Sequence, residues 1–288
     1  MNLKRGAPMK KITLAAGQFV VKNDMVSNKK IILKQIEQAK KKRAKIILFP
    51  ECGLTGYTSG DQGPMENLTV KEVDDALKEI GDSAKKNKIY VAVGSCYFDK
   101  KKKKLFNSVI VYNDKGKKVC VFSKMGLCKG EMKYFERGTE LPTFVIDGVR
   151  FGLQICFDVR FAENYRSYFK KDVHVVLHAY HQAGIPEIAA QRRDLIEAFQ
   201  RVRSSENAIY TITSNTIGLN KGKDQWIPTM VVNARGDVIR KSAPGRTGII
   251  VETIQADDIL ENIEMEIRDY SKKLLGMKTL GKRKIKGN

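Results

Sequence analysis

Short apolar segments of strand length recur along the chain, and this repetition restricts its fold more than any other feature. Each segment is either continuously apolar or alternates apolar with polar residues, as expected for a β-strand buried on one or both faces. The segments lie at residues 12–20, 44–49, 89–98, 106–112, 118–122, 143–156, 174–179, 208–214, 229–239 and 248–253. Strands in this number predict a system of β-sheets at the centre of the protein.

Five other segments carry the 3.6-residue periodicity of helices that pack on one face. They cover residues 28–43, 73–86, 163–169, 187–206 and 257–275. Early strands alternate with helices, whereas turn signals at 113–116, 147–148 and 234–237 predict hairpins. We therefore expect an α/β protein with mixed sheets and helices outside them. No Pro/Gly/Ser-rich linker and no internal repeat divides the chain, which favours one compact domain.

The net charge of +21 suggests binding to a polyanion, but its distribution argues against a surface that reads nucleic acid. Four cations lie in residues 1–11 and seven in residues 271–288, so 21 − 11 leaves +10 for the rest. Five lysines form the run 100–104, between two strand segments, where a hairpin tip is expected. No RNA-binding aromatic motif or zinc-finger spacing accompanies them. Weak, salt-sensitive adhesion of solvated basic ends is the preferred interpretation.

Cysteine content and hydropathy restrict the cellular compartment in which the protein is expected. The five cysteines are odd in number and contain no C-x-x-C pair, so neither a disulfide framework nor a zinc site is predicted. No segment approaches the roughly eighteen apolar residues of a membrane-spanning helix. The basic start imitates a secretory signal poorly, because Gln18 interrupts the apolar stretch and no A-x-A site follows. We expect a soluble protein in the reducing cytoplasm.

The segment FGLQICFD at residues 151–158 is the strongest candidate for chemistry. An apolar strand runs into Cys156, and a helical pattern follows Asp158, which predicts a thiol exposed at a sharp junction between strand and helix. A helix N-terminus there would lower the pKa of the thiol, because its partial positive charge favours the thiolate. The alternative is that Cys156 is a buried small apolar residue, as most free cysteines are.

Two further segments end apolar strands in ionisable residues. Glu51 follows Pro50 at the end of such a run, where partial burial of a carboxyl group raises its pKa towards the range useful for proton transfer. Lys124 ends another apolar run, and Glu131 follows it seven residues later. Taken singly, each has an ordinary alternative as a loop acid or a surface lysine.

Together the three segments resemble the nitrilase superfamily of carbon–nitrogen hydrolases. That family has a Glu-Lys-Cys triad in this order, with the cysteine in an I-C-x-D-x-R-F-x-E context; this chain has Glu51, Lys124, Cys156 and ICFDVRFAE at residues 155–163. The family's second glutamate falls on Glu131, and SNTIG at 214–218 and MVVNARGD at 230–237 look like its late strand and hairpin. The local RFAE sequence is most similar to the ω-amidase and Nit-like enzymes of the amidase branch.

The resemblance implies an α-β-β-α sandwich whose subunits pair into a homodimer or a higher homo-oligomer. It also implies that Glu51 is the general base and acid, and that Cys156 attacks the amide or nitrile carbon. Lys124 and the backbone N–H of Phe157 would hold the oxyanion, and Glu131 would support Lys124 or the attacking water. No metal or organic cofactor is required by this mechanism.

On this basis we expect a basic tail at residues 1–10, a carbon–nitrogen hydrolase domain at 11–255, and a C-terminal helix with a basic tail at 256–288. The expected activity is hydrolysis of a linear, non-peptide C–N bond in a small amide, with release of ammonia or amine through a thioester. An N-carbamoyl amine hydrolase or a nitrilase with the same triad is the alternative enzyme. A non-catalytic polyanion-binding or scaffolding protein on the same fold is the alternative from another class.

Residues beside the nucleophile have structural interpretations. Asp158 is predicted to cap the following helix, and Arg160 to pair with an acid. Strand alternation puts His174 and His178 on one face and His181 on the other, which is a poor arrangement for a metal site.

Candidates for the wall of the substrate pocket follow two of the predicted strands. They are Tyr57, just beyond Glu51, and the pair Tyr180 and His181. The alternative for the histidine is an ordinary packed imidazole. Trp226 precedes a proline and is predicted to pack either at a subunit contact or in the core.

Overall fold

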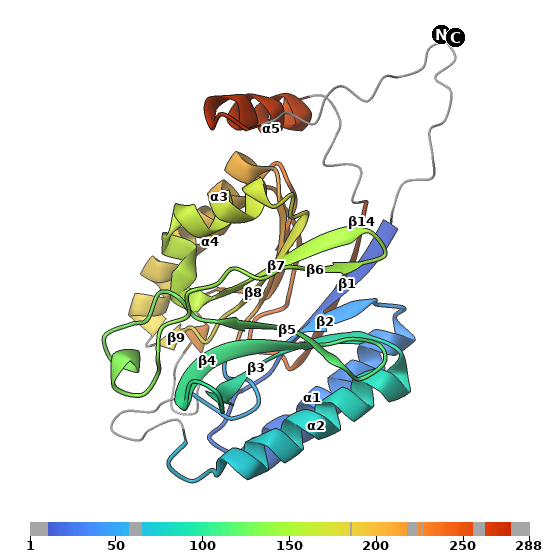
Figure 1. The fold of residues 1–288 in the computed structure, drawn as a ribbon, viewed down its shortest axis with the longest axis vertical. Coiled ribbons are helices and arrows are strands. Elements are labelled where there is room, and N and C mark those ends of the chain that lie inside the picture. Colours follow the sequence, from blue (N-terminus) through green and yellow to red (C-terminus); the bar gives the residue numbers. More distant parts are fainter. Residues whose placement is uncertain are drawn as a thin grey trace.

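Two six-stranded sheets face each other at the centre of the molecule, and helices cover their outer faces (Figure 1). The computed structural model describes residues 11–57, 65–184, 186–217, 224–225, 227–255 and 263–277. Trp226 therefore lies outside the described residues. The expected α-β-β-α sandwich is confirmed.

The first sheet has the strand order β14-β1-β2-β3-β4-β5. Its three central strands are parallel and are joined by two helices, α1 and α2, whereas the other strands are antiparallel to their neighbours. The elements are β1 (Lys11–Gln18), α1 (Met25–Lys41), β2 (Ile46–Leu48), α2 (Val70–Asn87), β3 (Tyr90–Asp99), β4 (Lys104–Tyr112), β5 (Lys118–Ser123) and β14 (Gly248–Gln255).

The second sheet repeats this plan in the order β13-β12-β10-β8-β7-β6. Strands β7, β8 and β10 are parallel, and helices α3 and α4 connect them. The elements are β6 (Phe144–Ile146), β7 (Val149–Ile155), α3 (Ala162–Lys170), β8 (Val175–Ala179), α4 (Pro186–Asn207), β10 (Tyr210–Ser214), β12 (Met230–Val232) and β13 (Val238–Lys241). Two short strands, β9 (Ala183–Gly184) and β11 (Asp224–Gln225), pair separately, and α5 (Ile263–Leu274) follows β14.

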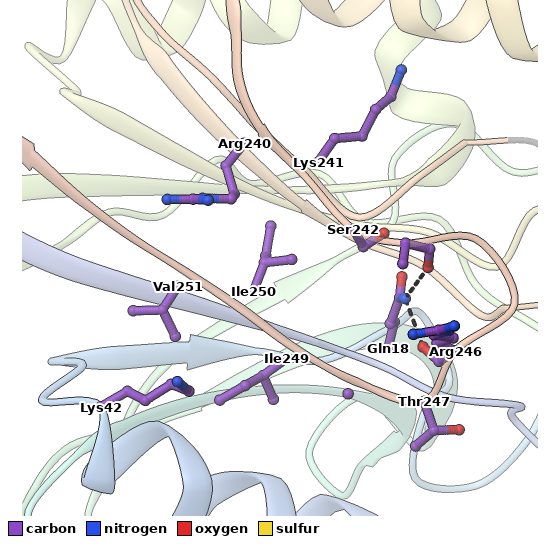
Figure 2. Close-up of a pocket in the computed structure, with 12 residues that line it drawn as sticks. Gln18, Lys42, Arg240, Lys241, Ser242, Arg246, Thr247, Ile249, Ile250 and Val251 are labelled. Atoms are coloured by element: carbon purple, nitrogen blue, oxygen red, sulfur yellow. Dashed lines mark hydrogen bonds between the residues drawn. The ribbon is translucent and has the colours of Figure 1, made fainter.

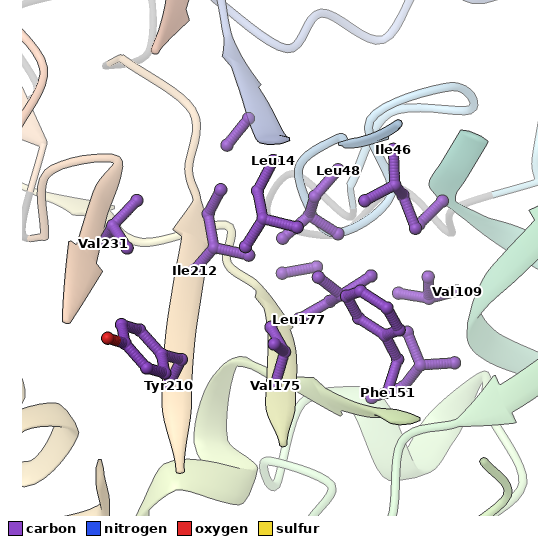
Figure 3. Packing of buried hydrophobic residues seen from close by; sticks show 14 of the residues in the cluster. Leu14, Ile46, Leu48, Val109, Phe151, Val175, Leu177, Tyr210, Ile212 and Val231 are labelled. Atoms are coloured by element: carbon purple, nitrogen blue, oxygen red, sulfur yellow. The ribbon is translucent and has the colours of Figure 1, made fainter. Parts of the chain in front are cut away.

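Alternation along each strand assigns side chains to one of two layers. In β1, Ile12 and Leu14 enter the core between the sheets, whereas Ala15 packs beneath α1 and α2. Figure 3 shows Leu14 of the first sheet close to Ile212 of the second. Complete burial of such a side chain contributes about 1.5–3 kcal/mol, so this layer holds the sheets together.

The three predicted hairpins are present at the expected turns. Residues 113–116 join β4 to β5, 147–148 join β6 to β7, and 234–237 join β12 to β13. The lysine run 100–104 lies at the turn between β3 and β4, as expected. No helix within the described part of the chain is long and apolar enough to cross a membrane.

Candidate active site

Chemically active side chains gather where the parallel strands of both sheets end. Glu51 follows β2, Cys156 follows β7, and His181 follows β8. The carboxyl ends of parallel strands are the usual ligand-binding edge of an α/β sheet. Gly94 on β3 makes room for the turn after β2, because a Cβ at Gly94 would collide with the backbone of Pro50.

Lys124 lies between two carboxylates in the interior. Its Nζ is 2.6 Å from Oε1 of Glu51 and 2.8 Å from Oε1 of Glu131. The Lys124 and Glu51 side chains are 0% exposed and that of Glu131 is 1% exposed. The chain therefore brings together the three charged residues that the sequence singled out, in a place where charges persist only with close partners.

Asn107, on β4, joins both carboxylates. Its Nδ2 donates to Oε1 of Glu51 at 2.8 Å and to Oε1 of Glu131 at 3.0 Å. Its backbone carbonyl accepts a 2.8 Å hydrogen bond from the N–H of Lys124. Sequence reasoning missed this residue, although an asparagine within an apolar strand is a signal that could have identified it.

Backbone N–H groups complete the coordination of the carboxylates. The second oxygen of Glu51 accepts from the N–H of His181 at 2.9 Å. The second oxygen of Glu131 accepts from the N–H of Cys128 at 2.8 Å. Each carboxylate is thus fixed at both oxygens, so its orientation relative to Lys124 is determined by the fold.

The surroundings move the pKa values of the two glutamates apart. Burial, opposed by Lys124, raises the pKa of Glu51. Burial also acts to raise the pKa of Glu131, but the Lys124 ammonium and several hydrogen bonds outweigh it and lower that pKa. The pKa of Lys124 lies well above its ordinary value, because the neighbouring negative groups outweigh the opposite effect of burial. Glu131 is thus the permanent carboxylate, and Glu51 is the carboxyl group suited to exchange a proton.

Cys156 stands at the sharp junction that the sequence predicted. It follows β7 directly, begins a single short 3₁₀ turn (Cys156–Arg160), and has a φ of 47°. Few residues other than glycine adopt this left-handed backbone, and such strain is often found at functional sites. The expected exposure of the thiol is wrong, because the residue is buried and only 7% exposed.

The expected lowering of the thiol pKa is wrong. Burial raises the pKa of Cys156 well above its ordinary value, the Glu51 carboxylate adds to this effect, and Lys124 opposes it. A five-residue 3₁₀ turn supplies too little positive charge to offset the lost hydration. Cys156 is therefore a thiol at rest, and its sulfur becomes a good nucleophile only when that proton is removed.

Gln182 and Asn215 are further polar residues near Cys156. Nε2 of Gln182 lies 3.4 Å from Sγ of Cys156. The Asn215 side chain accepts from the N–H of Gln182 at 2.8 Å and donates to its carbonyl at 2.9 Å. Neither was predicted as a site residue, although Asn215 lies in the SNTIG segment that resembles the family's late strand.

Asp158 has a structural place, although not the one expected. Its oxygens accept from the N–H of Gly126 at 2.6 Å and of Ile155 at 3.2 Å, so it ties the segment after Lys124 to the turn at Cys156. The cap position of α3 is occupied by Phe161 instead. Burial raises the pKa of Asp158 to about 7.

The Arg160 guanidinium lies over aromatic rings. It is 5.6 Å from the ring centroid of Phe157 and 5.4 Å from that of Phe199. Within the described part of the chain no carboxylate lies within ion-pair distance of it, so the expected pairing with an acid is wrong there. Phe157 follows Cys156 directly, which places its backbone N–H next to that residue.

The predicted pocket residues occupy different depths. The rings of Tyr57 and His181 stack at 4.7 Å, and burial raises the pKa of the Tyr57 phenol. Tyr180 is fully buried, stacks on His178 and is hydrogen-bonded to Gln200; its carbonyl accepts from the N–H of Glu51 at 3.2 Å. Tyr57 and His181 thus form an aromatic pair beside Glu51, and the Tyr180 ring belongs to the core.

The remaining histidines serve the structure. His178 is fully buried and its Nε2 lies 3.2 Å from the carbonyl oxygen of Cys156, which supports the turn at Cys156. Burial lowers its pKa to about 3, so it stays neutral. Nδ1 of His174 accepts from the N–H of Arg150. No group of three or more His, Cys, Asp or Glu side chains arranged to hold a metal ion was found among the described residues.

A separate basic hollow lies along β14 and the turn before it. Figure 2 shows Lys42, Arg240, Lys241 and Arg246 around this hollow. Its volume is about 450 Å³. Arg240 pairs with Glu252 at 2.9 Å and Lys241 with Glu197 at 2.7 Å, so half of these cations are already neutralised. Lys124, Glu51 and Glu131 do not line this hollow.

Comparison with known proteins establishes the family. The model of the carbon-nitrogen hydrolase family matches residues 13–262, so this chain belongs to that family. The chain is 26% identical over 273 residues to the omega-amidase NIT2 of Xenopus tropicalis, covering 91% of this chain and 93% of that protein. It is thus, as expected, an enzyme of the carbon–nitrogen hydrolase class.

Other relatives agree with this assignment. The nitrilase and fragile histidine triad fusion protein NitFhit of Drosophila melanogaster is 24% identical over 237 residues, which are 79% of this chain. The match spans about half the length of that relative, 50%. Among solved structures, an amidase from Nesterenkonia sp. superposes with a TM-score of 0.75 at 20% identity, covering 90% of this chain and 96% of that one. The structural likeness supports the sandwich fold.

Proposed function

We propose that this protein hydrolyses a small, linear, non-peptide amide through a thioester on Cys156. The observation that carries the proposal is the buried Lys124 ammonium held by two carboxylates, Glu51 at 2.6 Å and Glu131 at 2.8 Å, whose charges also act on the Cys156 thiol. A cation, a base of raised pKa and a neutral thiol in one interior site are the components of nucleophilic amide hydrolysis.

In the first half-reaction the sulfur attacks the amide carbon. The Cys156 proton passes to Glu51, the S–C bond forms, and the carbonyl oxygen becomes an oxyanion. Lys124 and the backbone N–H of Phe157 stabilise this oxyanion; a single preorganised donor contributes about 3–4 kcal/mol in comparable sites. Glu51 then gives its proton to the nitrogen, the C–N bond breaks, and ammonia or an amine leaves.

In the second half-reaction water replaces the sulfur. Glu51, again a carboxylate, takes a proton from the water as its oxygen attacks the thioester carbon. The C–S bond breaks, the proton returns to the sulfur, and the carboxylic acid leaves. Glu131 remains ionised throughout, because Lys124 and the N–H of Cys128 hold its charge, and it keeps Lys124 in place for both oxyanions.

The names of the relatives suggest the substrate class. Omega-amidases and an amidase occur among them, which favours a small amide such as an ω-amido acid. An N-carbamoyl amine hydrolase or a nitrilase would use the same residues and is the alternative. The Tyr57 and His181 ring pair is proposed as part of the pocket wall.

We also propose that the chain forms a homodimer through α4. Three apolar side chains spaced by seven residues, Ile188, Leu195 and Val202, are 41%, 40% and 50% exposed along this helix. Residues with this spacing fall on one helix face, and an exposed apolar stripe is typical of a packing surface. A second copy would present the same stripe in a symmetric contact.

The test is an activity screen with a mass measurement. Wild type is mixed with ω-amides, carbamoyl amines, aliphatic amides and nitriles; ammonia release is followed, and intact mass reports acyl-enzyme. We expect ammonia from small amides and a trapped acyl adduct that Cys156→Ala cannot form. Turnover by Cys156→Ala at the wild-type rate would contradict the proposal.

A further inference from the structure

Gln182 carries a buried oxygen without a partner next to the nucleophile. The residue is 8% exposed, and its Nε2 points to Sγ of Cys156 at 3.4 Å. No side-chain or backbone donor in the described part of the chain reaches its Oε1. Buried polar atoms nearly always have hydrogen-bond partners, so an unpaired acceptor beside a reacting sulfur calls for a donor from outside the chain.

The backbone of this residue is held rigidly. Asn215 is fully buried and clamps the Gln182 backbone with hydrogen bonds of 2.8 Å and 2.9 Å. The Asn215 amide also donates to the carbonyl of Ile227 at 2.8 Å, which fixes the clamp to a third segment. A preorganised acceptor loses little entropy when a ligand donates to it.

The neighbouring residue, His181, shows that Gln182 lies close to Glu51, the proposed general base. The N–H of His181 donates to Glu51 at 2.9 Å, and the next side chain along the chain reaches Cys156 at 3.4 Å. His181 therefore contacts Glu51, and Gln182 contacts Cys156. A substrate carbon bonded to Sγ carries its leaving nitrogen between these two contacts, because Glu51 must protonate that nitrogen.

We propose that Gln182 is a specificity-determining residue whose Oε1 accepts a hydrogen bond from the N–H of the scissile amide while its Nε2 contacts the attacking sulfur. The inference rests on the proposed function and narrows its substrate class. Amides and carbamoyl compounds bring an N–H to this acceptor. Nitriles and esters bring none and leave the oxygen unpaired, so the site selects against them.

The test compares two substrates that yield the same acyl-enzyme. Wild type and Gln182→Leu are assayed on a primary amide and on the p-nitrophenyl ester of the same acid, and kcat/KM is measured for each. Loss of a hydrogen bond that orients the amide lowers kcat/KM for the amide by about 10- to 100-fold. The value for the ester changes by less than about threefold, because the ester makes no such bond.

Two further variants separate recognition from folding. Gln182→Glu retains an acceptor oxygen of the same reach, so its ratio of amide to ester activity stays closer to wild type than that of Gln182→Leu. Gln38→Leu, on the outer helix α1, is the matched control and leaves both activities unchanged. Thermal melts of all three verify that each variant is folded.

The outcomes are distinct. Acyl-enzyme formation by wild type together with an equal loss, or no loss, on both substrates in folded Gln182→Leu overturns the inference and leaves the proposed function standing. No acyl-enzyme from wild type with either substrate overturns both. A selective loss on the amide supports the assignment of Gln182 to the leaving nitrogen.

Discussion

The side-chain amide of Asn107 donates a 2.8 Å hydrogen bond to Oε1 of Glu51, the same oxygen that receives the Lys124 ammonium at 2.6 Å. Its second N–H donates to Glu131, and Sγ of Cys52 contacts its oxygen at 3.5 Å. Every polar atom of the amide is thus used. Asn107 fixes the distance between two carboxylates that would otherwise repel each other, and it does so without adding charge.

Asn107→Ala should therefore impair catalysis and shift its pH dependence. A hydrogen bond to a charged group contributes about 1.5–3 kcal/mol, which corresponds to a decrease of about 10- to 100-fold in kcat/KM. Because the Asn107 hydrogen bond lowers the pKa of Glu51, its loss moves the acid limb of the pH–rate profile to higher pH. Asn87→Ala, at the end of α2, is the control. A reduced rate with an unmoved acid limb would limit Asn107 to a structural role.

The pH profile of the wild type follows from the two buried glutamates. Glu51 accepts a proton only as a carboxylate, so activity falls as the pH falls through its pKa, which burial raises above its ordinary value. Lys124 stays charged to high pH, since its pKa is also raised. We expect the acid limb of the kcat/KM profile for ammonia release to have its midpoint above about pH 4.3, the ordinary pKa of glutamate. Deprotonation of Lys124 should cause no loss of activity below about pH 10. An acid limb at or below pH 4 would contradict this assignment.

Sequence patterns were sufficient to predict site residues at the ends of strands, but not site residues that make contacts from within a strand. Glu51, Lys124 and Cys156 each follow an apolar run, and a shared edge of the sandwich brings them together. Asn107 lies within β4, and its contact with Glu51 depends on the register of several strands, which periodicity does not determine. The prediction of a lowered pKa for the Cys156 thiol was wrong for a related reason. The sequence indicates where a helix starts, but it does not show how deeply the thiol is buried.

Replacement of Glu51, the proposed general base, should slow the reaction of iodoacetamide with Cys156 but not with Cys128. Cys156 is a thiol of raised pKa and needs Glu51 to take its proton, whereas Cys128 is partly exposed and reacts by its own ionisation. Glu51→Gln should slow alkylation of Cys156 by about 100-fold, the smaller end of general-base effects, and leave Cys128 unchanged. Peptide mass spectrometry over time measures both rates in one sample. Equal labelling of Cys156 in both proteins would remove Glu51 from this role.

Asp158→Asn should destabilise the protein by about 1–3 kcal/mol, because the new amide turns an N–H₂ towards the N–H of Ile155 or of Gly126. The difference from wild type should depend on pH. The folded pKa of about 7 lies above the unfolded value, so the native state binds more protons between about pH 4 and 7 and loses stability as the pH rises. Urea titrations at pH 5 and pH 8 should show a smaller gap between the two proteins at pH 8. A larger difference in stability at pH 8 than at pH 5 would contradict a buried Asp158 that is protonated at low pH.

A charge on the exposed stripe of α4 should separate the subunits. Leu195 is 40% exposed midway between Ile188 and Val202, so a symmetric contact would bury its side chain against the partner. Leu195→Glu would force an unpaired carboxylate into that contact, which costs several kcal/mol and weakens association by at least about 100-fold. We expect light scattering after gel filtration to give twice the 32.5 kDa chain mass for wild type and the chain mass for the variant. Val119→Glu, a similar change at an exposed site on β5, should leave the dimer intact, and a dimer that survives Leu195→Glu would place the subunit contact elsewhere.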